Sequence, residues 1–124
     1  MNLIKINEPK KKITDDVVLC IGIDFGTTNS VCSIKKNKKV VCIEDDLKNK
    51  LIPSIVLYER KKKYIGNEAM NKKNFLSSVF SVKRFFIKNP DEKVFINEND
   101  QKVSAIEVSK EIFTHLKENC DKFL

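Results

Sequence analysis

The sequence predicts an α/β domain in which a mixed β-sheet carries a phosphate-binding hairpin and is flanked by helices. Residues 17–25 form a nearly continuous apolar run, typical of a buried central strand, and a Gly-Thr-Thr-Asn turn follows at residues 26–29. Short β-branched segments separated by turn residues then continue to residue 65. From residue 105 apolar side chains recur at helical spacing until residue 120. Strands alternating with amphipathic helices indicate an α/β class.

The first 43 residues divide into an extension and a three-stranded meander. Residues 1–16 hold Pro9 and a charged run, so we expect an N-terminal extension there and a folded unit over residues 17–124. Residues 30–34 can return antiparallel to residues 17–25, and a Lys-Asn-Lys turn leads into a third strand at residues 40–43. The phosphate turn therefore lies at one end of the meander.

The remaining elements are predicted from turn and capping signals. Strands are expected at residues 54–58, 64–65, 94–97 and 101–103, and helices from about residue 68 into the seventies, at residues 79–86 and from residue 105 to the end. Asn67 is a plausible N-cap for the first helix. Ser104 and Glu107 have the spacing of a capping box that begins the last helix. Four phenylalanines have the spacing of core residues in two short helices: Phe75, Phe80, Phe85 and Phe86.

The turn between the first two strands contains the candidate binding residues. Gly26 lets the backbone approach a phosphate closely, and successive turn amides from Thr27, Thr28 and Asn29 can form a concavity that binds anions. The threonine hydroxyls add further donors. Asp24 ends the strand, and Mg²⁺ commonly takes one or two carboxylates together with substrate phosphates and waters. The pattern predicts a site for a magnesium-bound phosphate ester.

Composition limits the other classes of function. The chain has 124 residues, a net charge of +7 and 24 Lys and Arg residues, of which only Arg60 and Arg84 are Arg. The lysine runs at residues 10–12, 35–39 and 60–63 fall where turns are expected, and no aromatic residues interleave with them. These runs favour solvated loops over a surface that binds nucleic acid. A small basic nucleic-acid-binding module is kept as the less favoured alternative.

The four cysteines and the single histidine show no metal-binding spacing. Cys20, Cys32 and Cys42 lie in apolar β-like segments, and Cys120 lies in the last helix, without any C-x-x-C pair. Free buried cysteines are typical of a reducing compartment, and no segment has the length of a membrane span, so we expect a cytoplasmic protein. His115 stands alone and is expected at the surface or at a helix edge.

Several segments, taken in order, resemble one family. Residues 21–30, Gly-Ile-Asp-Phe-Gly-Thr-Thr-Asn-Ser with its preceding isoleucine, resemble the first phosphate motif of the actin-like ATPases in the form found in the 70-kDa heat-shock chaperones of the DnaK type. Residues 51–56, 64–69 and 81–84 resemble that family's proline-serine strand, glycine-led helix entry and lysine-arginine helix. Residues 3–9 and the terminal helix at 108–112 resemble the HscA branch, which serves iron-sulfur cluster assembly.

The resemblance implies a partial actin-like ATPase (ribonuclease H-like) fold, as the N-terminal part of a nucleotide-binding domain. It implies that residues 26–29 contact the β- and γ-phosphates of ATP, that Asp24 lies near the Mg²⁺ and its waters, and that Lys83 is the catalytic lysine that stabilises charge on the γ-phosphate. It further implies ATP and ADP as ligands, with a J-domain co-chaperone, an iron-sulfur scaffold protein and unfolded proteins as partners. Phe85 and Phe86 stand where the family usually has a glycine soon after the lysine-arginine pair.

Two expectations follow from the 124 residues taken by themselves. They contain no counterpart of the family's second phosphate loop, adenosine pocket or substrate-binding domain, so we expect little ATP turnover from them alone. Hydrogen bonds from an exposed turn replace bonds to water and gain little. An inactive remnant of such a chaperone is therefore an alternative to a fragment of a functional ATPase.

Overall fold

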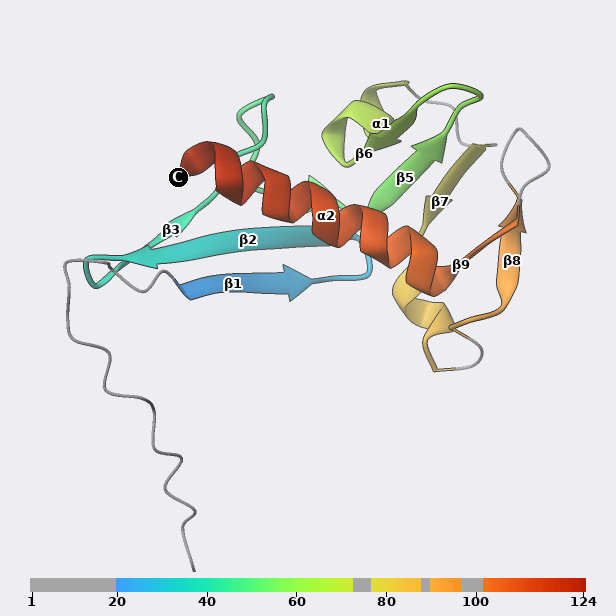
Figure 1. Ribbon diagram of the computed structural model, residues 1–124, viewed down its shortest axis with the longest axis horizontal. Helices are drawn as coiled ribbons and strands as arrows, with labels where there is room; N and C mark the ends of the chain where they lie inside the picture. The colour runs from blue at the N-terminus through green and yellow to red at the C-terminus, as the bar shows by residue number, and fades with distance from the viewer. Residues whose placement is uncertain (1–19, 73–76, 88–89, 97–101) are drawn as a thin grey trace, which may run out of the picture.

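The computed structural model describes residues 20–72, 77–87, 90–96 and 102–124. The predicted extension at residues 1–16, the start of the first strand and Phe75 lie outside these residues. The elements, in chain order, are β1 (Cys20–Phe25), β2 (Asn29–Lys36), β3 (Lys39–Cys42), β4 (Ile52–Pro53), β5 (Ile55–Tyr58), β6 (Lys63–Ile65), α1 (Asn67–Lys72), β7 (Ser78–Phe80), the 3₁₀ helix η2 (Val82–Phe85), β8 (Lys93–Ile96), β9 (Lys102–Ser104) and α2 (Ala105–Phe123). Figure 1 shows their arrangement.

The predicted meander is confirmed in the first sheet. β1, β2 and β3 pair antiparallel in sequence order, and β4 adds to the start of β2. Asn37 and Lys38 have positive φ angles of 50° and 65°, which suit the tight two-residue turn between β2 and β3. The turn at residues 26–29 lies at the opposite end of β2 (Figure 1).

The expectation that the first strand is central and buried is wrong for its described residues. β1 is an edge strand, and Ile21 and Ile23 keep 45% and 40% of their surface exposed. An apolar run indicates that both faces of a strand are apolar, but it does not indicate how many strands pair with that strand. β5 is the strand buried on both faces, and all four of its residues are buried.

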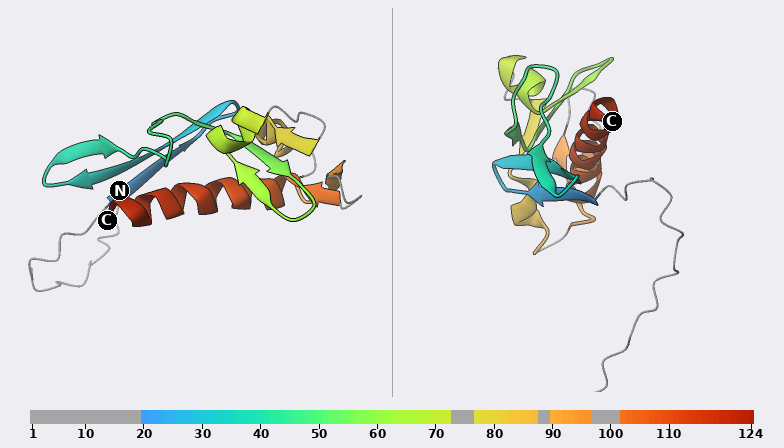
Figure 2. Two further views of the ribbon diagram at one scale, coloured as in Figure 1. Left: turned by 90° about the horizontal axis from the view of Figure 1, so that it is seen from above. Right: turned by 90° about the vertical axis from the view of Figure 1, so that its left-hand side faces the viewer.

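β5 lies between the helices α1 and α2. It is the middle strand of the sheet β6-β5-β7. Ile55 and Leu57 pack with Ala69 of α1, whereas Val56 and Tyr58 join the larger core beneath α2. Figure 2 shows α2 running along one side of the strands, with α1 on the other side of β5. This packing joins the two sheets into one unit.

Helix α2 forms the main core with β2 and β5. The predicted capping box is present: the Glu107 amide donates to Ser104 Oγ at 3.1 Å, and the Ser104 amide donates to Glu107 Oε2 at 2.7 Å. The predicted apolar stripe is buried, and its members are Ala105, Val108, Ile112, Leu116 and Cys120. The helix is therefore fixed at its start by local hydrogen bonds and along its length by burial.

Three local predictions are wrong. The helix expected over residues 79–86 is divided into β7, which pairs with β5, and the short helix η2. Phe80, Phe85 and Phe86 are not core residues, because they keep between 36% and 54% of their surface exposed. Asn67 does not cap α1 from outside, since it is the first helical residue and its amide side chain donates to Asp45 Oδ2 at 2.7 Å.

Candidate functional site

The turn between β1 and β2 is closed so tightly that only glycine fits at its first position. The Gly26 amide donates to the Asn29 carbonyl oxygen at 3.0 Å. A Cβ atom added to Gly26 would lie 2.2 Å from that same oxygen, a separation that carbon and oxygen never adopt without a bond. Gly26 is thus required by close backbone approach, as expected for a turn that presents its amides outward.

Ser54 holds this turn from the neighbouring strand. Its hydroxyl donates to the Gly26 carbonyl oxygen at 2.9 Å, and its amide donates to the Thr28 carbonyl oxygen at 2.8 Å. The buried Ser30 hydroxyl lies 2.8 Å from Ser54 Oγ. Because these bonds occupy the carbonyl groups of the turn, they leave its amide face available for a ligand.

The amides of Thr27 and Thr28 are the available donors. Neither amide donates a hydrogen bond to any residue that the structure describes. Thr28 and Asn29 are exposed and Thr27 is half-buried. Consecutive free amides at the end of a tight hairpin form an anion-binding concavity, and the threonine hydroxyls can add to it.

Lys83 reaches the hairpin from a distant part of the chain. Its Nζ atom donates to the Phe25 carbonyl oxygen at 2.9 Å, across 58 residues of sequence. Val82, its neighbour in η2, is buried in the main core and anchors this short helix. Ser81 precedes η2 with a left-handed φ of 56°, a conformation that costs about 1–2 kcal/mol for a residue with a side chain. Tertiary packing therefore aims Lys83 at the turn.

The positions of Phe25 and Asp24 follow from strand alternation. Phe25 faces α2 and its ring lies 5.0 Å from that of Phe113. Asp24 is exposed and projects from the opposite face of β1, directly before the turn. Among the described residues no three His, Cys, Asp or Glu side chains cluster to hold a metal ion. A lone carboxylate beside free amides fits Mg²⁺ that arrives with a phosphate ligand, and it does not fit a dedicated protein cage.

The structure thus brings Gly26, Thr27, Thr28 and Asn29 together with Lys83, and it places Asp24 at the end of the same strand. Sequence reasoning missed Ser54 as a residue that positions the turn. Its signal was present in the proline-serine segment at residues 51–56, but the segment was assigned only as a strand. The contact with the turn depends on the pairing of β2 with β4, which no local pattern reveals.

His115 is more enclosed than the sequence suggests. It is half-buried on α2, and its Nε2 atom is buried without a hydrogen-bond partner among the described residues. Burial lowers the pKa of His115 below its ordinary value, because the charged imidazolium would lose hydration there. Gly66 and Asp45 border it, and neither belongs to the hairpin site.

The described lysine runs lie in turns, as predicted. Residues 35–39 span the β2–β3 turn and the strand ends beside it, residues 60–63 span the β5–β6 turn and the first residue of β6, and all are exposed. These turns lie at opposite ends of the molecule (Figure 1), so their charges do not combine into one basic surface. No described helix is long and apolar enough to cross a membrane.

Comparison with known proteins shows which family the chain is similar to. The model of the family described as Hsp70 protein matches residues 20–122. The chain is 37% identical over 137 residues to the chaperone protein HscA of Buchnera aphidicola subsp. Schizaphis graminum, covering 94% of this chain and 22% of that protein. It is 26% identical to the HscA homolog of Rickettsia bellii, covering 100% of this chain and 23% of that protein. It is 33% identical over 105 residues to the chaperone protein DnaK of Mesomycoplasma hyopneumoniae strain 232, covering 84% and 17% of the two chains.

These matches show how much of its relatives the chain covers and which family it belongs to. The chain spans about a fifth of the length of the curated relatives that it matches. Its α/β arrangement agrees with the predicted fold class, since the nucleotide-binding domain of the matched family has the actin-like ATPase fold. The match to the family model extends over most of the sequence, so the chain belongs to the Hsp70 family.

Proposed function

We propose that this chain supplies the first phosphate-binding elements of an ATP-dependent chaperone. Residues 17–124 would form the N-terminal part of its nucleotide-binding domain, after an extension at residues 1–16. In this proposal Gly26, Thr27, Thr28 and Asn29 bind the β- and γ-phosphates of ATP, and Asp24 holds Mg²⁺ directly or through its waters. Lys83 stabilises negative charge on the γ-phosphate during hydrolysis.

The convergence of Lys83 on the hairpin is the observation that carries the proposal. The Lys83 ammonium group is held at the Phe25 carbonyl oxygen, one residue before Gly26. In the same region Ser54 donates to the Gly26 and Thr28 carbonyl groups, while the Thr27 and Thr28 amides donate no hydrogen bond to a described residue. A cation beside a row of free amides attracts a triply or quadruply charged phosphate chain and gives no comparable benefit to a neutral ligand.

The cellular role that we propose is chaperoning of proteins in iron-sulfur cluster assembly, in the cytoplasm. The similarity to chaperone proteins named HscA supports this branch over a general chaperone. By that similarity, the complete protein would act with a J-domain co-chaperone, an iron-sulfur scaffold protein and unfolded clients. Solvated lysine turns at opposite ends of the molecule give no support to a nucleic-acid-binding module.

Titration of the chain with Mg-ATP, followed by ¹H–¹⁵N spectra, tests the proposed site because it detects weak binding and locates it. The amide signals of residues 26–29 should shift most, and removal of Mg²⁺ with EDTA should reduce the shifts. Lys83→Met should weaken binding by up to about fivefold, since an exposed charge contact contributes up to about 1 kcal/mol. Lys110→Met is the matched control, because Lys110 is an exposed lysine on α2.

Two outcomes would count against the site. Equal weakening by both lysine variants would mean that net charge attracts ATP without a specific contact. If the largest shifts occurred in another part of the chain, ATP would bind elsewhere.

Steeply salt-dependent binding to DNA or RNA, with no response to Mg-ATP, would support the nucleic-acid alternative. Little hydrolysis is expected from these residues alone, and robust magnesium-dependent hydrolysis lost in Lys83→Ala would contradict that expectation.

A further inference from the structure

Two free cysteines from opposite ends of the described chain meet in the main core. The Sγ atoms of Cys32 on β2 and Cys120 on α2 are 2.6 Å apart, although 88 residues separate them in sequence. Their side chains keep only 2% and 0% of their surface exposed. The other two cysteines, Cys20 and Cys42, are exposed. Of the four cysteines, Cys32 and Cys120 are therefore the buried pair, and their sulfur atoms lie side by side.

The sulfur separation fits a covalent bond between the thiols and does not fit a shared metal ion. A disulfide has a sulfur–sulfur distance of about 2.0 Å, so a movement of roughly half an ångström would complete it. Two thiolates on a tetrahedral Zn²⁺ at about 2.3 Å each lie roughly 3.8 Å apart. Among the described residues no third His, Cys, Asp or Glu completes a metal cluster with them. The pair is thus arranged for oxidation.

We propose that Cys32 and Cys120 form a reversible disulfide that fastens helix α2 to strand β2 when a low-molecular-weight disulfide such as oxidised glutathione is present. The disulfide would be a covalent modification of the folded chain. It does not depend on nucleotide binding. It would close a loop of 88 residues, and that loop contains every described element from β3 to the last turn of α2.

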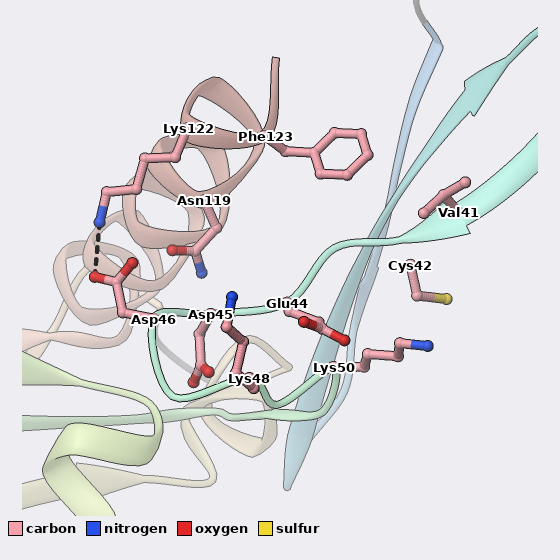
Figure 3. A pocket seen from close by; sticks show the side chains of 10 residues that line it. All are labelled: Val41, Cys42, Glu44, Asp45, Asp46, Lys48, Lys50, Asn119, Lys122 and Phe123. Carbon is pink, nitrogen blue, oxygen red and sulfur yellow. Dashed lines mark hydrogen bonds and ion pairs between the residues drawn. The ribbon is translucent and has the colours of Figure 1, made fainter.

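Access to the buried thiols is provided by the end of α2. Cys120 lies in the last turn before the helix ends at Phe123. That turn is held by the Cys120 carbonyl oxygen, which accepts from the Leu124 amide at 3.1 Å, and by an ion pair between Lys122 and Asp46 at 2.8 Å. Figure 3 shows this ion pair beside an open hollow. An exposed ion pair contributes little, so the last turn can fray without unfolding of the sheets.

The closed state protects the thiols from reaction. Burial raises the pKa of the Cys32 thiol to about 12, and the adjacent Cys120 sulfur acts in the same direction. Because the thiolate is the reactive form, Cys32 reacts slowly while it is packed. Opening of the last turn would expose Cys120 Sγ to a disulfide in solution. Oxidation would then follow helix opening.

The exchange takes place in two balanced steps. The Cys120 thiolate attacks one sulfur of oxidised glutathione, which forms a mixed disulfide and releases one glutathione thiolate. While the last turn of α2 is still open, the hydrated Cys32 thiol loses its proton to water, its thiolate attacks Cys120 Sγ and expels the second glutathione thiolate, and α2 then packs again. Overall, two protein thiols are oxidised and one glutathione disulfide is reduced to two glutathione molecules. Reduced glutathione in excess reverses both steps.

The test is to oxidise the complete chain with a glutathione redox buffer and then to identify its bonds by mass spectrometry. The expected product loses two hydrogen atoms in mass and yields a cross-linked peptide pair that contains Cys32 and Cys120. Cys120→Ser should abolish this product. Cys42→Ser is the matched control that should retain it, because Cys42 is exposed on β3.

A measurement on the unmodified sequence keeps the test independent of whether the variants fold. The oxidised chain should unfold at a urea concentration higher by about 1 M or more than the reduced chain, because the cross-link restricts the unfolded state. The proposal would be overturned if Cys20 and Cys42 became glutathionylated while Cys32 and Cys120 stayed reduced. It would also be overturned if the oxidised and reduced chains unfolded at the same urea concentration.

Discussion

Ser54→Ala should destabilise the fold by more than an ordinary serine substitution. The Ser54 hydroxyl carries one proton, and this proton goes to the Gly26 carbonyl oxygen, which can only accept. Ser30 must therefore donate to Ser54 Oγ. The substitution removes both bonds at once and leaves the fully buried Ser30 hydroxyl without an acceptor.

The expected loss follows from these two bonds. Each hydrogen bond contributes about 1 kcal/mol net, and leaving a buried hydroxyl without an acceptor costs about 1 kcal/mol or more. The free energy of unfolding should therefore fall by about 2–3 kcal/mol. Because m values for urea lie at about 1–3 kcal/mol per molar, the midpoint of unfolding should fall by about 1–2 M. Ser109→Ala is the matched control, since Ser109 is buried but bonds only within α2, to the Ala105 carbonyl oxygen at 2.7 Å.

A double variant sharpens the test. Removal of both hydroxyls in Ser30→Ala/Ser54→Ala loses the shared hydrogen bond only once and leaves no donor without an acceptor, so its loss should be smaller than the sum of the two single losses by about 2 kcal/mol. Urea unfolding followed by circular dichroism gives all four free energies of the cycle. The reasoning would be refuted if Ser54→Ala stayed within about 0.5 kcal/mol of the parent chain, which is the usual range for surface substitutions. Strict additivity of the two substitutions would refute it equally.

Two further predictions concern the turn and the buried histidine. Gly26→Ala should lower the free energy of unfolding by about 2 kcal/mol or more, because its Cβ would lie 2.2 Å from the Asn29 oxygen and the turn must open. Urea midpoints should show a much smaller loss for Gly22→Ala, whose Cβ meets only the Ser33 hydroxyl at 3.0 Å. Stability should fall as pH decreases below the ordinary His115 pKa of 6.5, because burial lowers the folded-state pKa and the unfolded chain then binds the proton more readily. The charged groups that act on this imidazole are Glu118, Asp45, Glu68 and Lys122. His115→Gln should reduce the dependence of the free energy of unfolding on pH between about pH 7 and pH 5, where an unperturbed imidazole titrates. An unchanged pH dependence would assign the effect to other groups.

Local chemistry explains which parts of the fold could be predicted. The β1–β2 hairpin, the β2–β3 turn and the capping box at Ser104 each depend on residues within a few positions of one another. Such signals act over short stretches of chain and need no tertiary contact, so the sequence contains them directly. For the same reason the glycine and the threonines of the turn at residues 26–29 could be named as candidate binding residues from the sequence alone.

Long-range packing explains what could not be predicted. The edge position of β1 depends on which strands lie beside it, and the Ser54 contact with the turn depends on β4 joining β2. Residues 79–86 have apolar spacing that suits a helix, yet the first of them belong to β7, which pairs with β5 instead. The Cys32–Cys120 contact joins the first sheet to the last helix. Each of these outcomes required knowledge of a partner distant in sequence.

The edge position of β1 has a consequence for handling the chain in solution. Among the described residues no strand pairs with its outer side, so backbone donors and acceptors there are open to another extended chain. β1 holds no lysine, proline or bulge that would discourage such pairing, and its apolar Ile21 and Ile23 are partly exposed. The net charge of +7 makes copies of the chain repel one another, which opposes such pairing. Salt weakens that repulsion, since screening reaches a length of about 10 Å at 0.1 M, and low ionic strength therefore favours the dispersed monomer.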